Sequence, residues 1–386
     1  MLAYYSRILR DRLPVTDADD AEPLLHLDAA ADWLMRAFEA DGSGGVPHSY
    51  NLRRRAWDRP YPETTGYIIP TFLDYAAFRS RDTFRNAALR MAGWEVEILC
   101  ADGGVQSGVY DPARPNPPTI FNTGQVLFGF VRAYEATRDN SFLDALRRSA
   151  DWLVNAQDAD GAWRRFSSPF AKSGTNPYNT RTAFGLARAF EVTQDERYLR
   201  AAIRNVEWAA AQADPDGWIQ GNCLSDHDGD KALTHTIAYT MRGILEVGQA
   251  AGRPDFVDLA MRIGSEVAGR QRPNGSLPGY LEQGWRPAAS WSCLTGNVQF
   301  AINWHRAATI SGRTEFLKHA ASAIRFTAAT QDLRADEPGV RGGIKGSHPI
   351  DGDYMKGRYP NWAAKFFMDA LLLQLAGPGS RSNIGA

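Results

Sequence analysis

The sequence predicts an all-α protein in which six helical hairpins close into a ring, an (α/α)6 toroid. The first observation is a repeated unit, clearest at residues 179–217, where an apolar helix, a Thr-Gln-Asp turn, a second helix and an Asp-Gly turn follow one another. The second is that this unit occurs six times at a nearly constant interval. The third is that the two helices of each unit differ in character. Such self-similarity is typical of repeat architectures.

The individual helices are expected where apolar residues recur at helical spacing between turn residues. The segment 24–38 carries Leu24, Leu27, Leu34 and Phe38 on one face and ends at the glycine-rich run 41–45. The later helices are expected at 65–78, 83–100, 123–137, 142–157, 180–193, 198–212, 234–249, 255–271, 295–311, 316–331 and 361–375.

The first helix of each pair begins at a threonine or an asparagine. A side-chain oxygen at this place accepts hydrogen bonds from the free N–H groups of the first turn, so we expect these residues to be N-caps. They are Thr65, Thr123, Thr180, Thr234, Thr295 and Asn361.

The two helices of a pair are expected in different layers. The first is apolar or small nearly all round, as at 182–187, whereas the second is amphipathic with Arg and Glu outside, as at 197–208. Helices that are apolar on every side are buried, and amphipathic helices cover them. With 24–38 as the partner of the last helix, the ring closes without an end repeat. We therefore expect one domain over residues 1–386, ending in a polar tail at 377–386.

The composition is globular and gives no strong field of one sign. The 386 residues are 44% hydrophobic and 23% charged, with a formal net charge of −1. This balance does not favour nucleic acid or a membrane surface as a partner. Cys100, Cys223 and Cys293 are too few for a disulfide framework and lack zinc-site spacing. The start of the chain lacks signal-peptide features and no stretch is long and apolar enough to cross a bilayer, so we expect a cytoplasmic protein.

Function is expected on one face of the ring. Short turns follow the inner helices on the opposite face, while six long loops lead to the N-termini of the inner helices. Free N–H groups and the positive end of the helix dipole favour anionic groups there. Loops held by a rigid scaffold commonly carry function. These loops are 41–64, 102–122, 161–179, 217–233, 275–294 and 341–360.

Helices paired in this way resemble the six-hairpin toroids of carbohydrate-active enzymes, which include unsaturated uronyl hydrolases, glycoside hydrolases, polysaccharide lyases and sugar epimerases. The motif Gln157-x-x-Asp160-Gly161-x-Trp163 is also similar to the repeat of terpene cyclase and prenyltransferase toroids. The segments 61–70, 341–347 and 359–363 resemble an uncharacterised bacterial group associated with exopolysaccharide biosynthesis. The resemblance implies the toroid fold and a carbohydrate substrate, but this fold hosts many chemistries.

Glu63, Asp228 and Asp353 are the candidate catalytic carboxylates. An inverting glycosidase needs one acid that protonates the leaving oxygen and one carboxylate that activates water. All three precede inner helices, so the ring could bring a pair together, and Glu63 with Asp228 is the first choice. The run 226–230 can instead be a solvated turn or a weak Ca²⁺ site built from alternating oxygens.

His235 and Tyr239 are a second candidate pair. They lie one turn apart on the same face at the start of an inner helix. Beside Arg181, which could neutralise a uronate, they suit proton abstraction next to a carboxylate, the first step of a lyase or a C5-epimerase. The alternative is that His235 is a satisfied polar residue at a helix start.

Aromatic and basic residues of the loops are candidate substrate contacts, because aromatic faces stack on sugar rings and Arg or Lys pairs with carboxylates. Trp163 and Trp218 recur in the repeat and are instead expected to wedge the turn against the outer helix. The candidate binding residues are Arg55, Trp57, Tyr61, Tyr178, Asn179, Arg181, Trp291, Lys345, His348, Tyr354 and Arg358.

The sequence therefore predicts an enzyme of bacterial surface-polysaccharide metabolism that hydrolyses glycosidic bonds in an oligo- or polysaccharide, which we expect to contain uronate. A polysaccharide lyase or uronyl C5-epimerase is the second hypothesis, and a non-catalytic glycan-binding protein is the third. We expect no cofactor, no metal at the site, no nucleic-acid partner and no membrane insertion. The oligomeric state stays open.

Overall fold

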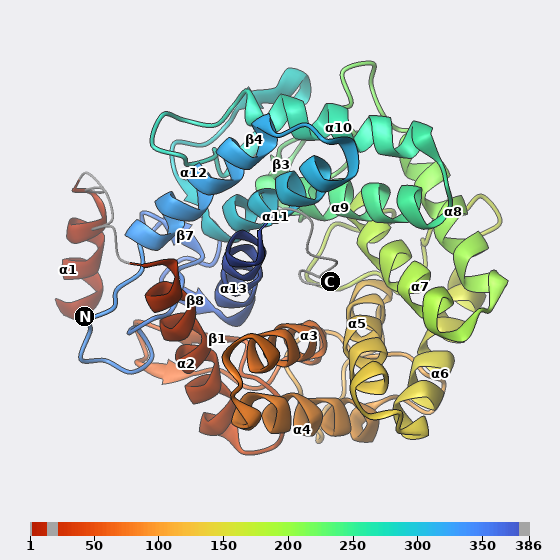
Figure 1. The fold of residues 1–386 in the computed structure, drawn as a ribbon, viewed down its shortest axis with the longest axis horizontal. Coiled ribbons are helices and arrows are strands. Elements are labelled where there is room, and N and C mark those ends of the chain that lie inside the picture. The colour runs from red at the N-terminus through yellow and green to blue at the C-terminus, as the bar shows by residue number, and fades with distance from the viewer. Residues whose placement is uncertain (1, 14–21, 378–386) are drawn as a thin grey trace.

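Two concentric layers of helices form the molecule, as a computed structural model of residues 2–13 and 22–377 describes it (Figure 1). The inner layer consists of α3 (Pro62–Arg79), α5 (Ile120–Thr137), α7 (Thr180–Thr193), α9 (Thr234–Ala250), α11 (Leu294–Ser311) and α13 (Asn361–Ala376). The outer layer consists of α2 (Pro23–Asp41), α4 (Asp82–Ile98), α6 (Asn140–Ala156), α8 (Glu196–Ala210), α10 (Pro254–Ala268) and α12 (Glu315–Ala329). This confirms the predicted (α/α)6 toroid. Residues 378–386 of the predicted polar tail lie outside the described residues.

The ring closes through its inner helices. Each inner helix contacts the next, and α13 completes the ring by contacting both α3 and its outer partner α2. Glycines allow the close approach: a Cβ built at Gly129 of α5 would lie 2.5 Å from the carbonyl oxygen of Gly66 in α3. The same holds one step further, where a Cβ at Gly185 of α7 would lie 2.6 Å from the carbonyl oxygen of Gly124 in α5. Small residues on the inner helices therefore set the diameter of the ring.

The predicted N-caps are wrong in their position. α3 and α5 begin before Thr65 and Thr123, so both threonines lie inside the first turns. The Thr65 hydroxyl donates to the Tyr61 carbonyl at 2.9 Å and accepts from the backbone N–H of Val46, also at 2.9 Å. Thr123 makes the corresponding bonds in the next hairpin. The remaining four lie within the first turn of their helices, with no side-chain cap of this kind. In the first two hairpins, the repeated threonine holds the preceding long loop against its inner helix.

Short strands that the sequence analysis did not predict join the long loops to one another. β1 (Ser49–Asn51) lies between β2 (Ala56–Trp57) and β8 (Arg358–Pro360). β3 (Ala232–Leu233), β4 (Tyr280–Glu282) and β5 (Arg286–Pro287) form a second sheet, and β6 (Ser292–Cys293) pairs with β7 (Ser347–His348). All these pairs are antiparallel. Because each pairing links loops that lead to neighbouring inner helices, or lies within one such loop, the strands fix the long-loop face.

An additional helix, α1 (Leu2–Asp11), lies outside the ring and was not predicted (Figure 1). Its carboxyl end carries Asp11, which forms a buried ion pair with Lys345 at 2.6 Å. Asp11 also accepts from the backbone N–H of Ile350 at 3.0 Å, and Arg7 pairs with Asp332 at 2.7 Å. The helix thus packs against the loop that leads to α13.

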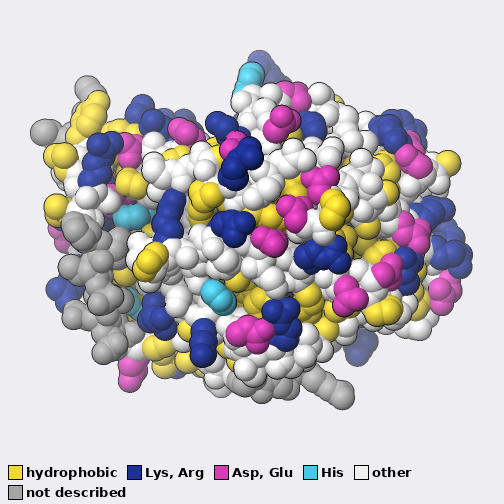
Figure 2. All heavy atoms as spheres, turned by 90° about the horizontal axis from the view of Figure 1, so that it is seen from above, with side chains coloured by type: hydrophobic (Ala, Val, Ile, Leu, Met, Phe, Trp, Pro, Cys, Tyr) yellow, Lys and Arg dark blue, Asp and Glu magenta, His cyan; other side chains and the backbone are white. Residues whose placement is uncertain are grey.

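The repeated tryptophans are buried, as expected. The Trp163 indole N–H donates to the carbonyl oxygen of Leu153 in α6 at 3.0 Å, and Trp218 packs edge-on against Trp285 at 5.2 Å between ring centres. On the face drawn in Figure 2, acidic and basic side chains are interspersed. Among the described residues, no helix is long and apolar enough to span a membrane.

Candidate functional site

Glu63 lies in the first turn of α3, where the long-loop face meets the ring. Burial raises the pKa of Glu63 from 4.5 to about 7, and the nearby Tyr61 side chain, which lowers this pKa, offsets only part of the effect. Desolvation disfavours the charged form of a carboxyl group in this way. Glu63 therefore keeps its proton up to about neutral pH.

His235 lies in the first turn of α9 and is buried. Burial, together with the nearby positive charge of Arg181, lowers the pKa of His235 to about 4, so the imidazole is neutral at neutral pH. Its Nδ1 lies 2.6 Å from the amide oxygen of Gln299 in α11. Because that oxygen can only accept, Nδ1 carries the proton and Nε2 has the free lone pair.

Tyr239 follows one turn after His235 on α9, and their ring centres are 4.5 Å apart. Burial, and then the charge of Glu63, raises the pKa values of Tyr239 and of Tyr178. Tyr354 stacks on His235 from the loop before α13, at 5.5 Å between ring centres. The Trp362 indole donates to the Tyr354 hydroxyl at 2.9 Å.

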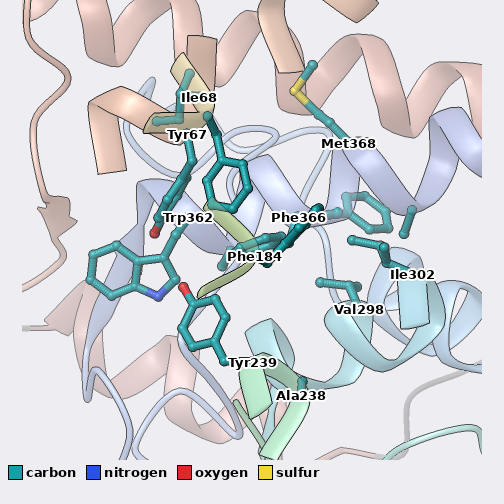
Figure 3. Close-up of a cluster of buried hydrophobic side chains, with 14 of the residues drawn as sticks. Tyr67, Ile68, Phe184, Ala238, Tyr239, Val298, Ile302, Trp362, Phe366 and Met368 are labelled. Atoms are coloured by element: carbon teal, nitrogen blue, oxygen red, sulfur yellow. The ribbon is translucent and has the colours of Figure 1, made fainter. Parts of the chain in front are cut away.

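These side chains form one group, which we call the Glu63 cluster. It contains three residues predicted as catalytic and three predicted as substrate contacts. They come from the loop before α3, α3 itself, the loop before α7, α9 and the loop before α13. Figure 3 shows the hydroxyl groups of Tyr67 and Tyr239 pointing toward the Trp362 ring, at the edge of this cluster. The members of the cluster are Tyr61, Glu63, Tyr178, His235, Tyr239 and Tyr354.

Two further predicted residues, Asn179 and Arg181, lie next to the Glu63 cluster, close to its member Tyr178. Tyr178 and Asn179 belong to the short 3-10 helix η1 (Pro177–Asn179), and both are buried. Phe121 joins Tyr178 to Tyr239, with ring centres 5.2 Å and 5.1 Å away respectively. Arg181 lies deeper, 1% exposed, with its guanidinium 4.4 Å from the centre of the Phe128 ring and 5.8 Å from that of Tyr239.

Asp228, Asp353 and Trp291 lie instead around Tyr280. The Tyr280 hydroxyl donates to one oxygen of Asp228 at 2.9 Å, and the backbone N–H of Ser225 donates to the other at 2.8 Å. Trp291 packs edge-on against the Tyr280 ring at 5.3 Å. Burial, then Asp228 and Asp353, raises the pKa of Tyr280. The structure therefore places Asp228 and Asp353 in a group of their own.

Two predicted contacts on the loop before α3 are held by the protein itself. Arg55 is exposed and pairs with Glu337 at 3.2 Å, and Trp57 packs on Trp33 at 5.0 Å between ring centres. Arg358, across the β1–β8 pairing, forms an ion pair with Asp58.

Lys345 and His348 lie beside α1. The Lys345 ammonium is buried against Asp11 and lies 3.2 Å from Nδ1 of His348. Burial, and then the charge of Lys345, lowers the pKa of His348 to about 4. These residues connect α1 to the long-loop face.

Three residues with a part in the cluster were missed from the sequence. Gln299 fixes the tautomer of His235, Trp362 holds Tyr354, and Phe121 bridges two tyrosines. Each lies in the first turns of an inner helix. Their position at the start of an inner helix could have marked them as candidates from the sequence. Their partners, however, lie on other segments of the chain, which the sequence does not pair with them.

Two of the three carboxylates in the run 226–230, those of Asp226 and Asp228, accept hydrogen bonds from the protein. Asp226 accepts from the backbone and hydroxyl of Ser173, and Asp228 caps η2 (Asp226–Asp228) as described above. Among the residues that the structure describes, no group of three or more His, Cys, Asp or Glu side chains could hold a metal ion.

Comparison with known proteins gives both a family model and solved structures. Residues 106–272 match the model for the β-L-arabinofuranosidase GH127 catalytic domain, a segment that includes His235 and Tyr239. A search of curated proteins found no match.

The solved structures share the fold at low identity. Unsaturated glucuronyl hydrolase from Bacillus sp. GL1 has a TM-score of 0.74 at 16% identity, covering 92% of this chain and 97% of that one. Cellobiose 2-epimerase from Bacillus thermoamylovorans B4167 has 0.72 at 12% identity, covering 92% and 98%. A D-mannose isomerase has 0.72 at 10% identity, covering 93% and 99%. These similarities establish the toroid fold and, with the family model, support a carbohydrate-active enzyme.

Proposed function

We propose that the protein is a carbohydrate-active enzyme that hydrolyses a glycosidic bond with Glu63 as the proton donor. The observation that carries this proposal is the pKa of Glu63, which burial raises to about 7. A general acid works best when its pKa lies near the working pH, because it is then protonated and can still release the proton. The match to a β-L-arabinofuranosidase catalytic domain supports hydrolysis over other reactions of this fold.

The surroundings of Glu63 suit a sugar ring. Tyr61, Tyr178, Tyr239 and Tyr354 offer aromatic faces and hydroxyl groups within one cluster. Sugar sites combine such aromatic surfaces with a few polar groups that fix orientation. We propose that the scissile bond lies between Glu63 and His235.

We propose His235 as the group that activates water. Its Nε2 has a free lone pair in the neutral imidazole. The sequence favoured Asp228, but both oxygens of that carboxylate already accept hydrogen bonds and it lies beside Tyr280. Asp228 and Asp353 are proposed to contact more distant parts of the glycan.

A lyase or C5-epimerase acting on a uronate is the second candidate. The specific observation in its favour is that the neutral His235 ring contacts the Tyr239 ring, with 4.5 Å between the ring centres. The Arg181 guanidinium lies 5.8 Å from the centre of the same Tyr239 ring. A base and an acid on one sugar ring are what proton abstraction and return require. A uronate-containing substrate and a role in surface-polysaccharide metabolism remain part of the proposal.

Product analysis distinguishes these reactions. The protein is incubated with arabinofuranosides and with uronate oligosaccharides, and reducing ends, absorbance of a C4–C5 double bond and deuterium at C5 are measured. New reducing ends that disappear in Glu63→Gln but persist in Asp353→Asn are expected. A double bond or deuterium uptake instead would select the second candidate. Glycan binding without any product would reject both and leave a binding protein.

A further inference from the structure

A small cavity lies below the Glu63 cluster, inside the inner ring. The volume open to the centre of a water-sized sphere is about 10 Å³, which is room for one water molecule or one monatomic ion. Figure 3 shows Ala238, Tyr239, Ile302 and Phe366 in this region. The polar residues of its lining are Arg181, Tyr239, Arg242, Gln299 and Asn303.

Three donors of this lining make no hydrogen bond of ordinary geometry within the protein. They are Nη2 of Arg181, the hydroxyl group of Tyr239 and Nε of Arg242. Nε of Arg242 still has an acidic neighbour, since it lies 2.8 Å from Glu246, whereas the other two donors have no such partner. Tyr67 and Gln299 lie near enough to affect the pKa of Tyr239, but neither makes a hydrogen bond of ordinary geometry with its hydroxyl. An unpaired buried donor costs free energy, more so when it is charged, so each such group calls for a partner.

The charged side chains around the cavity also indicate that Arg181 lacks a partner. Among the described residues, Arg181 has no acidic side chain within ion-pair distance, whereas Arg242 pairs with Glu246 at 2.8 Å. Arg306 of α11 shares the same Glu246 at 2.7 Å. One carboxylate therefore serves two guanidinium groups, and Arg181 adds a further positive charge.

The whole network between the inner helices has one more cation than anion. The bases are Arg132, Arg181, Arg188, Arg242, Arg306 and Lys365. The acids are Asp74, Glu135, Glu191, Glu246 and Asp369. While Glu63 of α3 is protonated, six bases against five acids leave an excess of one positive charge, and Arg181 is the base without an acid. A buried uncompensated charge is costly, so a counter-ion is favoured.

We propose that this cavity binds one halide-sized monovalent anion, chloride in ordinary buffers. Arg181 Nη2 and the Tyr239 hydroxyl would donate to it, and the second guanidinium of the lining would add attraction. A water molecule would satisfy the donors but leave the positive charge of Arg181 uncompensated. Gln299 lines the cavity and also holds His235 through its amide oxygen. A bound anion would therefore help to fix the position of His235 in the Glu63 cluster. The inference does not depend on the reaction proposed above.

Bromide in crystals of the full chain tests the site directly. An anomalous peak within hydrogen-bond distance of Arg181 Nη2 is expected after a bromide soak. A cavity that holds water, or that stays without an anomalous peak, would overturn the proposal. This measurement needs no variant and no substrate.

Stability in solution gives the second test. At constant ionic strength, replacing methanesulfonate by chloride or bromide is expected to raise Tm in proportion to the logarithm of halide concentration. Arg181→Met should abolish this rise, whereas Arg188→Met, an ion-paired arginine of the same helix, should retain it. A rise that persists in Arg181→Met would contradict the site. If glucuronate raises Tm and displaces bromide, Arg181 holds a substrate carboxylate and the proposal fails.

Discussion

Replacing Glu63 by glutamine should abolish activity and at the same time stabilise the protein at alkaline pH. Glutamine keeps the shape of the side chain but can neither ionise nor release a proton. Loss of a positioned general acid typically lowers rates by a factor of about 10² to 10⁴. We expect kcat/KM of Glu63→Gln to fall by this factor on the substrate found by product analysis. In the wild type, activity should decline above pH of about 7, since Glu63 then loses its proton.

The stability gain follows from the same pKa. Below pH 4.5 the carboxyl is protonated in the folded and the unfolded chain, so the wild type and Glu63→Gln should not differ through this group. Between pH 4.5 and about 7 the unfolded chain ionises first, and the wild type loses about 1.4 kcal/mol per pH unit relative to the variant. Above that range the difference should level off near 3 kcal/mol, because a pKa displaced from 4.5 to about 7 corresponds to roughly that free energy.

The assay is chemical denaturation of both proteins at pH 4, 6 and 8, alongside kcat/KM. Glu95→Gln is the matched control, since Glu95 is a buried carboxyl of α4 whose pKa burial also raises. It should show the same sign of stability change with unchanged activity. A Glu63→Gln enzyme that keeps its activity would refute the role of proton donor. A stability difference that does not vary with pH would refute the raised pKa.

Other consequences can be checked separately. With His235 as the base, kcat/KM should fall on the acid side only near pH 4, the pKa that burial gives this imidazole, and a fall near pH 6.5 in a pH–rate profile would contradict it. Lys345→Met leaves Asp11 as an unpaired buried charge, and calorimetric or denaturant unfolding should show a loss of about 3 to 5 kcal/mol. Adding Asp11→Asn should recover most of that loss. Gly129→Ala forces a Cβ against the Gly66 carbonyl and should cost about 1 to 3 kcal/mol in the same assay. Gly93→Ala on α4, where a Cβ meets nothing within 4 Å, should instead be neutral or stabilising.

The fold was predictable because the repeat has a nearly constant length and the same order of a buried and a covering helix in every copy. An apolar helix followed by an amphipathic one, six times, has few ways to bury its apolar faces, and a closed ring leaves none exposed. The start of α7 at Thr180 was predicted correctly for this reason. α1 was missed since its partners, Asp332 and Lys345, lie more than three hundred residues away in the chain. The short strands were missed because three of their five pairings join two different loops, which are neighbours in the fold but far apart in sequence.

The site was predictable in place but not in pairing. Position at the start of an inner helix selected Glu63, His235 and Tyr239, which the fold brings into one cluster. The same rule selected Asp228, whose oxygens are held by Ser225 and Tyr280 through the local geometry of its loop. The sequence around such a carboxylate does not show whether its side chain joins the Glu63 cluster or is held by neighbouring loop residues. Contacts between loops decide them.

The chemistry of the cluster therefore depends on neighbours rather than on the acid itself. Glu63 lies at a helix N-terminus, where the dipole favours the charged form, and the nearby Tyr61 side chain also lowers its pKa. Its pKa rises nevertheless, because burial outweighs both effects. Tyrosines on other inner helices and their loops share this buried environment. Substitutions that admit water beside Glu63, such as Tyr178→Ser, should thus lower its pKa and shift the alkaline limb of the activity profile downward.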